Sequence, residues 1–203
     1  MVATDLSRRD LLKVAGIAVL AATAPLSPVR AHAAEKPVLT AGDRFTMGEW
    51  GGEPILWRVL GVGDGNALVI SECGIDCQKF NYSVFNGNDW ETSNLKAWLN
   101  GEFFFGAFTP DEQARTQETT CLSVDEAERY FKDDNDRVCK PTAHVVQQGA
   151  YAGVGGCCWW LRSPGKRSNF ATCVYSNGYV NPHGEYVSSS RYAVRPALWL
   201  GLE

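Results

Sequence analysis

The sequence predicts an α+β fold built from short strands and short helices. Three observations support this class: two neighbouring β-branched runs joined by a Gly/Asp/Asn turn, two helix-capping boxes mid-chain, and a last third rich in Gly, Ser, Asn and Tyr. The chain has 203 residues, of which 45% are apolar and 21% charged, a composition typical of folded globular proteins. Its net charge of −4 argues against nucleic-acid binding, because neutralising phosphates requires a dense Lys/Arg surface.

The first segment has the pattern of an export signal. Arg8 and Arg9 precede an apolar run over residues 14–24, and small residues at Ala31 and Ala33 fit the −3 and −1 positions of a cleavage site. The run has 11 residues, whereas a membrane-spanning helix needs about 20. The segment therefore resembles a twin-arginine signal peptide, with a retained membrane anchor as the alternative.

This interpretation sets the expected domain boundaries and compartment. We expect a signal peptide at 1–33, a short lead-in at 34–44 and one domain at 45–203. Residues 7–13 would engage the twin-arginine export machinery. The mature protein would then be exported (secreted, periplasmic or associated with the cell envelope), with no stable membrane span after cleavage.

The first elements of the domain are a hairpin and a helix. Residues 55–62 and 67–71 are strand-like runs around the turn 63–66, which indicates a β-hairpin. Thr92 or Ser93 can cap a helix whose apolar stripe ends at Asn100-Gly101. We interpret its aromatic side chains, including Trp98, as core.

The middle of the chain contains two capping boxes. Thr109 with Glu112, and Ser123 with Glu126, have the spacing in which a hydroxyl and a carboxylate satisfy the first N–H groups of a helix. Both glutamates are therefore explained as capping residues. The acidic run 133–136 is expected to be a solvated loop, because a calcium loop begun at Asp134 would require Gly at residue 139.

The last third is expected to be rich in strands and loops. Strands are predicted over 157–162, 171–175, 179–180, 186–187 and 194–200, with tight turns at 163–165, 177–178 and 183–184.

All seven cysteines lie after the predicted signal, at Cys73, Cys77, Cys121, Cys139, Cys157, Cys158 and Cys173. Export would favour disulfides, and the odd number leaves at least one thiol free or paired between chains. The spacings do not match a zinc ribbon. We therefore expect structural cysteines, with no metal site and no cofactor.

Several tryptophan- and arginine-containing motifs together carry a family resemblance. These are Trp57-Arg58-Val59, residues 90–93, residues 95–100, the run WWLRSPG over 159–165 and the run VRPALWL over 194–200. In order and spacing they resemble an uncharacterised bacterial family known only as a domain of unknown function, over roughly residues 45–200.

That family is similar to the C-type-lectin-like fold of formylglycine-generating enzymes and of the variable proteins of diversity-generating retroelements. The resemblance implies a twisted, mainly antiparallel sheet with short flanking helices and a C-terminal binding face. The chain lacks the triplets of calcium-dependent sugar-binding lectins. Cys73 and Cys77 lie near the start of the domain, whereas the copper cysteines of the formylglycine-generating enzymes lie near its C-terminal end.

The candidate ligand-binding surface is the Tyr-rich segment over 175–192. Tyrosine offers a large amphipathic contact area at low entropy cost, while Ser, Asn and Gly supply hydrogen bonds and turns. The alternative is that these tyrosines only cover sheet edges and pair across strands. The candidate residues are Tyr175, Asn177, Tyr179, Asn181, His183, Glu185, Tyr186, Arg191 and Tyr192.

A second group is expected to be structural. Arg162 and Arg195 lie within apolar strands, where a charge requires a carboxylate or carbonyl partner. Anion binding by either arginine is the alternative. Trp57, Trp98 and Trp160 complete this group.

No catalytic constellation can be assembled from the sequence. The chain after the signal lacks a nucleophile elbow, a phosphate loop and a dinucleotide fingerprint. The leading hypothesis is therefore an exported module that binds an extracellular protein or glycan. The alternatives are a copper or thiol oxidoreductase resembling formylglycine-generating enzymes, and a variable target protein of a diversity-generating retroelement. The ligand, the disulfide pairing and the oligomeric state stay open.

Overall fold

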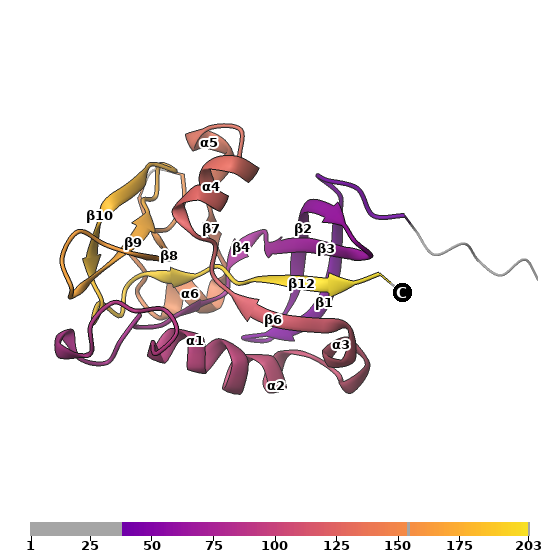
Figure 1. Cartoon of the computed structure of the whole chain (residues 1–203), viewed down its shortest axis with the longest axis horizontal. Coiled ribbons are helices and arrows are strands. Elements are labelled where there is room, and N and C mark those ends of the chain that lie inside the picture. The colour runs from indigo at the N-terminus through magenta and orange to yellow at the C-terminus, as the bar shows by residue number, and fades with distance from the viewer. Residues whose placement is uncertain (1–37, 154, 203) are drawn as a thin grey trace, which may run out of the picture. The chain divides into compact units, whose positions relative to one another are not determined.

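The computed structural model describes residues 38–153 and 155–202, and the export signal expected at 1–33 lies outside them. The described part contains both helices and strands, with strands in the majority (Figure 1). In the described ranges, no helix has the length and apolar character that crossing a membrane requires.

The strands form two five-stranded sheets and one small pair. Sheet 1 has the order β1-β2-β3-β12-β6, and sheet 2 has the order β10-β9-β8-β11-β5. Neighbouring strands are antiparallel except for β8 with β11 and for the separate pair β4 with β7. The strand bounds are β1 Arg44–Trp50, β2 Glu53–Gly63, β3 Asn66–Ser71, β4 Cys73–Gly74, β5 Asp76–Cys77, β6 Thr116–Thr120, β7 Lys140–Pro141, β8 Trp159–Pro164, β9 Phe170–Val174, β10 Val180–Tyr186, β11 Ala193–Val194 and β12 Ala197–Gly201.

The helices are short and flank the strands. In Figure 1, α1 and α2 lie along one side near β6, whereas α4 and α5 lie on the opposite side. The helix bounds are η1 Val84–Asn86, α1 Asn94–Trp98, η2 Leu99–Phe103, α2 Phe104–Ala107, α3 Pro110–Arg115, α4 Val124–Tyr130, α5 Asp134–Arg137 and α6 Ala143–Gln147.

The predicted hairpin is confirmed as β2 and β3. Asp64 (φ 51°) and Gly65 (φ 73°) form its two-residue turn, and positive φ at both positions is what the right-handed strand twist favours in tight hairpins. Both capping boxes are also confirmed. Glu112 additionally accepts a hydrogen bond of 3.0 Å from the Gly48 N–H, which ties α3 to β1.

The predicted helix begins as expected but ends later. Ser93 caps it, but the chain stays helical past Asn100 through η2 and α2 to Ala107, so the predicted end is wrong. The Asn100 amide donates to the carbonyls of Lys96 (3.0 Å) and Thr119 (2.8 Å), and its oxygen accepts from the Thr119 N–H. Asn100 thus anchors the helical segment to β6 instead of ending it.

Three other expectations need correction. The acidic run contains a short helix, α5, because the Asp133 side chain caps it by accepting from the Asp136 N–H. The strands expected at 179–180 and 186–187 belong to one strand, β10, whose register shifts between Asn181 and Glu185 in place of a turn. The strand expected at 194–200 is interrupted at Arg195, and its two parts join different sheets as β11 and β12.

The buried apolar side chains form two clusters that share strand β8. Trp160 belongs to the cluster that contains Trp57 and Phe103, whereas Trp159 belongs to the cluster that contains Phe131. Successive side chains of a strand point to opposite faces. Strand β8 is therefore covered on both faces, which explains why its sequence shows no apolar/polar alternation.

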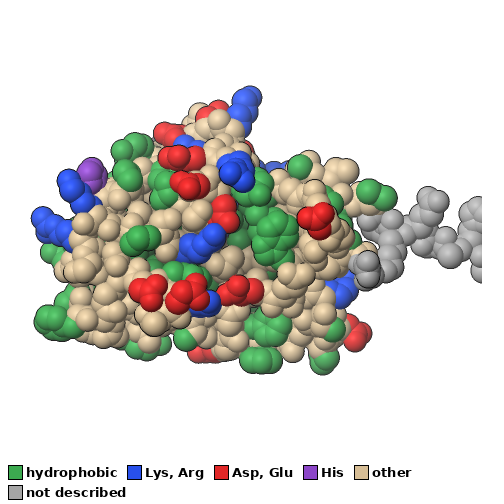
Figure 2. Space-filling model, viewed as in Figure 1, with side chains coloured by type: hydrophobic (Ala, Val, Ile, Leu, Met, Phe, Trp, Pro, Cys, Tyr) green, Lys and Arg blue, Asp and Glu red, His purple; other side chains and the backbone are tan. Residues whose placement is uncertain are grey.

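The face shown in Figure 2 carries no large field of one sign. Acidic and basic side chains are interspersed there, with apolar atoms exposed between them. This pattern differs from the basic stripe that marks a nucleic-acid interface.

Candidate functional site

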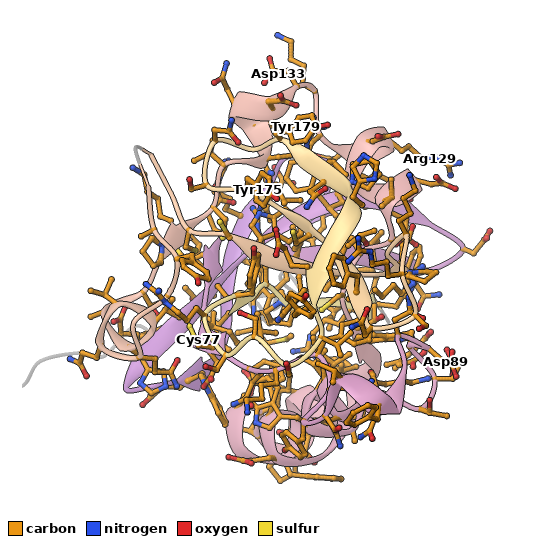
Figure 3. The ribbon with its side chains drawn as sticks, turned by 90° about the vertical axis from the view of Figure 1, so that its left-hand side faces the viewer. Cys77, Asp89, Arg129, Asp133, Tyr175 and Tyr179 are labelled. Carbon is orange, nitrogen blue, oxygen red and sulfur yellow. The ribbon has the colours of Figure 1, made fainter. Side chains whose placement is uncertain are left out.

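The candidate site is a hollow lined by residues of and beside sheet 2, whose strands β8–β10 lie at the end of the molecule that Figure 3 faces. It has a volume of about 390 Å³ and is open to solvent. Its lining comes from the segment before β8, from the β9–β10 turn, from β10 and from the segment before β11. The lining residues are Tyr151, Ala152, Cys158, Ser176, Glu185 and Tyr192.

Aromatic stacking forms one wall of the hollow. The Tyr192 ring lies against the Trp160 ring with centroids 4.4 Å apart, and Tyr151 meets Tyr192 edge-on at 5.7 Å. The Arg191 guanidinium lies 3.8 Å from the Tyr151 centroid, which is cation–π geometry. A continuous stack therefore runs from the fully buried Trp160 to the exposed Arg191. An apolar or sugar face can contact such a wall without ordering further side chains.

The hollow also contains a hydrogen-bond network around Glu185. The Tyr175 hydroxyl donates to Glu185 Oε1 at 2.8 Å, and the Asn181 amide donates to the Tyr175 oxygen at 2.8 Å. The same amide also donates to the Gly184 carbonyl at 3.2 Å, where the β10 register shifts. Glu185 is the only acidic side chain among the described lining residues, and Tyr175 orients it.

The tyrosine hydroxyls of the site stay protonated at neutral pH. Burial and the hydrogen bond to Glu185 raise the pKa of Tyr175. Burial, together with nearby Cys173 and Glu185, raises the pKa of Tyr192. Both groups therefore act as neutral donors and acceptors, and not as phenolate bases.

One thiol, Cys158, lines the site, and a second, Cys173, lies in the core on the same strand face. Trp160 pairs with Cys173 across β8 and β9, and Cys158 precedes Trp160 by two residues, so these three side chains share one face and one core cluster. Burial is the largest cause of the raised pKa of Cys158, and nearby Glu185 adds to it. Burial likewise raises the pKa of Cys173. Both groups are thiols at neutral pH, which disfavours nucleophilic chemistry.

The predicted ligand-binding residues divide into two sets. Tyr175, Glu185 and Tyr192, supported by Asn181 and Arg191, come together at the hollow. The others, Asn177, Tyr179, His183 and Tyr186, lie outside it but are exposed.

Two exposed tyrosines of the second set pack on their neighbours. Tyr179 lies beside Tyr175 with ring centroids 6.3 Å apart, and Figure 3 shows both at the same end of sheet 2. Tyr186 packs edge-on against Phe170 at 4.6 Å. Asn177 accepts from the Tyr179 N–H at 3.1 Å and so shapes the turn that presents Tyr179.

Tyr151, Cys158 and Ser176 also line the hollow but were not among the predicted ligand residues. Tyr151 lies in a Gly/Ala-rich loop, and an isolated aromatic side chain in such a loop was the signal that could have identified it. Cys158 and Ser176 reach the site only through the pairing of β8 and β9, which the local sequence does not encode.

The two arginines expected to be structural are both partnered. Arg162 binds Glu126, with Nη2 and Oε1 2.8 Å apart, and donates to the Cys121 carbonyl at 2.7 Å. Arg195 is 1% exposed and donates to the Ser71 carbonyl at 2.9 Å. Its guanidinium lies about 5 Å from the ring centroids of Phe131 and Trp159.

The three tryptophans of the structural group are buried as well. Trp57 donates to the Met47 carbonyl and Trp160 to the Gln78 carbonyl, both at 2.8 Å. Trp98 stacks on Phe103 with ring centroids 5.5 Å apart.

No group of three or more His, Cys, Asp or Glu side chains is placed to hold a metal ion within residues 38–153 and 155–202. All seven cysteines are free thiols in the structure.

The comparison with family models places the chain in one family. The model of a domain of unknown function (DUF6273) matches residues 64–129 and 117–202, which together cover more than half of the chain. The protein therefore belongs to the DUF6273 family. Neither a curated protein nor a solved structure matches the chain.

Proposed function

We propose that this protein is an exported binding module that recognises an extracellular protein or glycan at the hollow on sheet 2. The observation that carries the proposal is the combination of an aromatic wall (Tyr151 and Tyr192) with a single oriented carboxylate (Glu185) in one open depression. Ligand sites combine apolar or aromatic walls with a few placed polar groups in this way.

The proposal also includes the fold and the export route that the sequence predicts. The domain would be C-type-lectin-like, and residues 7–13 would direct export through the twin-arginine machinery. In support, Tyr151 at the hollow and Tyr179 and Tyr186 at the ends of β10 have exposed fractions of 42–50%. Large, half-exposed tyrosines are enriched at binding surfaces.

A glycan array and a pull-down from the cell envelope of the producing organism test the binding proposal. We expect Tyr151→Ala and Glu185→Gln each to reduce ligand retention at least tenfold. Tyr151→Ala removes part of the aromatic wall, and Glu185→Gln removes the charge of the carboxylate. Tyr82→Ala is the matched control, since Tyr82 is a 63% exposed tyrosine that does not line the hollow. Equal retention by all three variants and the wild type would disprove this site.

Export is tested separately. Changing Arg8 and Arg9 together to Lys keeps the charge of the segment but removes the arginine pair. We expect the protein to accumulate inside the cell, as measured by fractionation and immunoblotting. Unchanged export of this variant would contradict the twin-arginine assignment without affecting the binding site.

A copper or thiol oxidoreductase is the second candidate function. The observation that favours it is that Cys158, which lines the hollow, shares one strand face and one core cluster with the buried Cys173. Soft thiolates suit Cu(I), but both thiols are protonated at neutral pH, so metal binding would have to release their protons. Metal analysis after copper loading, with a count of reactive thiols, tests this candidate. Stoichiometric copper that is lost in Cys173→Ala would support it, and the absence of both bound copper and a reactive thiol would exclude it.

A further inference from the structure

Cys139 and Cys157 face each other across an antiparallel bridge. Cys139 lies before β7 and Cys157 before β8, and the bridge that joins them belongs to neither sheet. The Cys157 N–H donates to the Cys139 carbonyl at 2.7 Å. Hydrogen-bonded antiparallel pairs hold their Cα atoms about 5.5 Å apart. That separation lies inside the roughly 4.4–6.8 Å that disulfides span.

Both sulfur atoms point to the same place in the core. A Cβ atom built on Gly74 would lie 3.1 Å from Cys157 Sγ and 3.7 Å from Cys139 Sγ, so the two sulfurs lie over this glycine. Both cysteine side chains are fully buried and belong to the cluster around Trp159. The two sulfurs therefore lie close together, and the Cys157 thiol hydrogen-bonds to Cys139.

The surroundings favour one of the two sulfurs as the attacking thiolate. Arg195 is buried nearby, and the hydrogen bonds that its guanidinium makes within the described residues go to the backbone carbonyls of Ser71 and Arg137. Burial alone would raise the pKa of Cys139. A hydrogen bond from the Cys157 thiol, the charge of Arg195 and the Gly74 N–H outweigh burial and lower that pKa. The pKa of Cys157 is raised, chiefly by its hydrogen bond to Cys139.

We propose that Cys139 and Cys157 form a disulfide when the protein folds in the presence of a small disulfide oxidant such as oxidised glutathione. Because both sulfurs are fully buried in the folded protein, the Cys139 thiolate attacks the oxidant before the core closes, breaks its S–S bond, forms a mixed disulfide and releases one thiol. The Cys157 sulfur then loses its proton and attacks Cys139 Sγ, which forms the Cys139–Cys157 bond and releases the second thiol. The protein loses two electrons and two protons, and the oxidant gains them.

The Cys139–Cys157 disulfide would close the segment that supplies Tyr151 to the hollow. Residues 139–157 include α6 and Tyr151, and the disulfide would fix both ends of this segment. Closing a loop of this length restricts the unfolded chain. For a domain of this size, we expect reduction to lower Tm by roughly 5–10 °C.

Peptide mapping after refolding tests the proposal. The full chain is unfolded, reduced, refolded in a buffer of reduced and oxidised glutathione, alkylated and digested without reductant. We expect a peptide pair linked through Cys139 and Cys157, together with alkylated Cys121. Free, alkylated Cys139 and Cys157, or a bridge from Cys139 to Cys73, would overturn the proposal.

Substitutions provide the second measurement. Cys139→Ala and Cys157→Ala should each abolish the difference in Tm between oxidised and reduced protein, because neither variant can form the bridge. Cys121→Ala is the matched control, since it also removes a fully buried thiol but should keep the difference. A Tm difference that persists in Cys139→Ala would show that another pair is responsible.

Discussion

Sheet 1 and sheet 2 have the same number of strands but differ in the regularity of their pairing. Strand β12 pairs with β3 over five consecutive residues without interruption. In sheet 2, no strand pair keeps its register for more than two consecutive partners within the described residues. Sheet 1 also contains register shifts, but three of its four strand pairs keep their register over at least three consecutive partners. Sheet 1 therefore has the longer hydrogen-bond ladders, whereas in sheet 2 hydroxyl and amide groups bond with one another near a hollow. Bulges and register shifts of this kind occur near functional sites.

The largest expected effect tests the core of sheet 1. Trp57→Ala removes a fully buried indole and its hydrogen bond to Met47, so we expect a loss of about 3–5 kcal/mol in the free energy of unfolding. Trp199→Ala is the matched control, because Trp199 is 39% exposed on the same sheet, and it should cost about 1 kcal/mol or less. Urea denaturation measures both values. Equal losses would mean that the stability of the domain does not depend on side chains packed on the buried face of sheet 1.

The next prediction compares one glycine from each sheet. Gly52, in the β1–β2 turn, and Gly184, in β10, both have φ 80°. A Cβ on Gly184 would lie 2.5 Å from the Ala171 carbonyl oxygen, whereas a Cβ on Gly52 would meet nothing within 4 Å. We therefore expect Gly184→Ala to lower the free energy of unfolding by about 3 kcal/mol and Gly52→Ala to lower it by about 1 kcal/mol.

Thermal denaturation of these two glycine variants gives the comparison. If Gly184→Ala loses no more stability than Gly52→Ala, the β10 backbone can shift to accommodate a Cβ atom. The geometry around Glu185 is then not fixed by backbone contacts.

A smaller effect concerns pH and the Glu126–Arg162 pair that links α4 to sheet 2. Burial opposes ionisation, but the hydrogen bonds from Arg162 and Ser123 outweigh it and hold the pKa of Glu126 below its usual value of 4.5. A lowered folded-state pKa stabilises the protein above pH 4.5, and this contribution is lost as pH falls through the folded-state pKa.

Glu126→Gln tests this pair and retains a side chain suited to the capping box. It should lower the free energy of unfolding by about 1 kcal/mol at pH 7 and by progressively less as pH falls below 4.5, as measured by urea denaturation over this pH range. A cost that does not change with pH would assign the effect to packing instead of charge.

The smallest expected change in stability is at the exposed edge of sheet 2. Tyr179→Ala removes a ring that is 49% exposed, so we expect a change within about 0.5 kcal/mol. If the ligand extends from the hollow over Tyr175, retention on the glycan array or pull-down should nevertheless fall. A large loss of stability would identify Tyr179 as a packing residue of sheet 2.

Local sequence signals predicted the elements whose causes are local. The Asp64-Gly65 turn, the Ser93 cap and both capping boxes depend on residues within four positions of each other, and the structure confirms them. The helix past Asn100 depends on a contact with Thr119, 19 residues away, which no local pattern encodes. Interactions of that range explain why the predicted helix end was wrong.

The candidate site was predictable only in part for the same reason. The abundance of tyrosine identified the correct segment, because Glu185 and Tyr192 line the hollow and Tyr175 hydrogen-bonds to Glu185. Tyr151 comes from a loop before β8 and reaches Tyr192 through tertiary packing. The sequence pattern also did not separate Tyr192, which is 5% exposed, from Tyr179, which is 49% exposed.

The interruption at Arg195-Pro196 has a consequence for how the chain is made. Strand β11 lies between β8 and β5, and β12 lies between β3 and β6, so both sheets contain an interior strand taken from residues 193–201. During translation, each sheet has a gap in its middle until these residues leave the ribosome. Neither sheet can therefore be completed before this segment is made, and a nascent chain that lacks it leaves unpaired strand edges in both sheets.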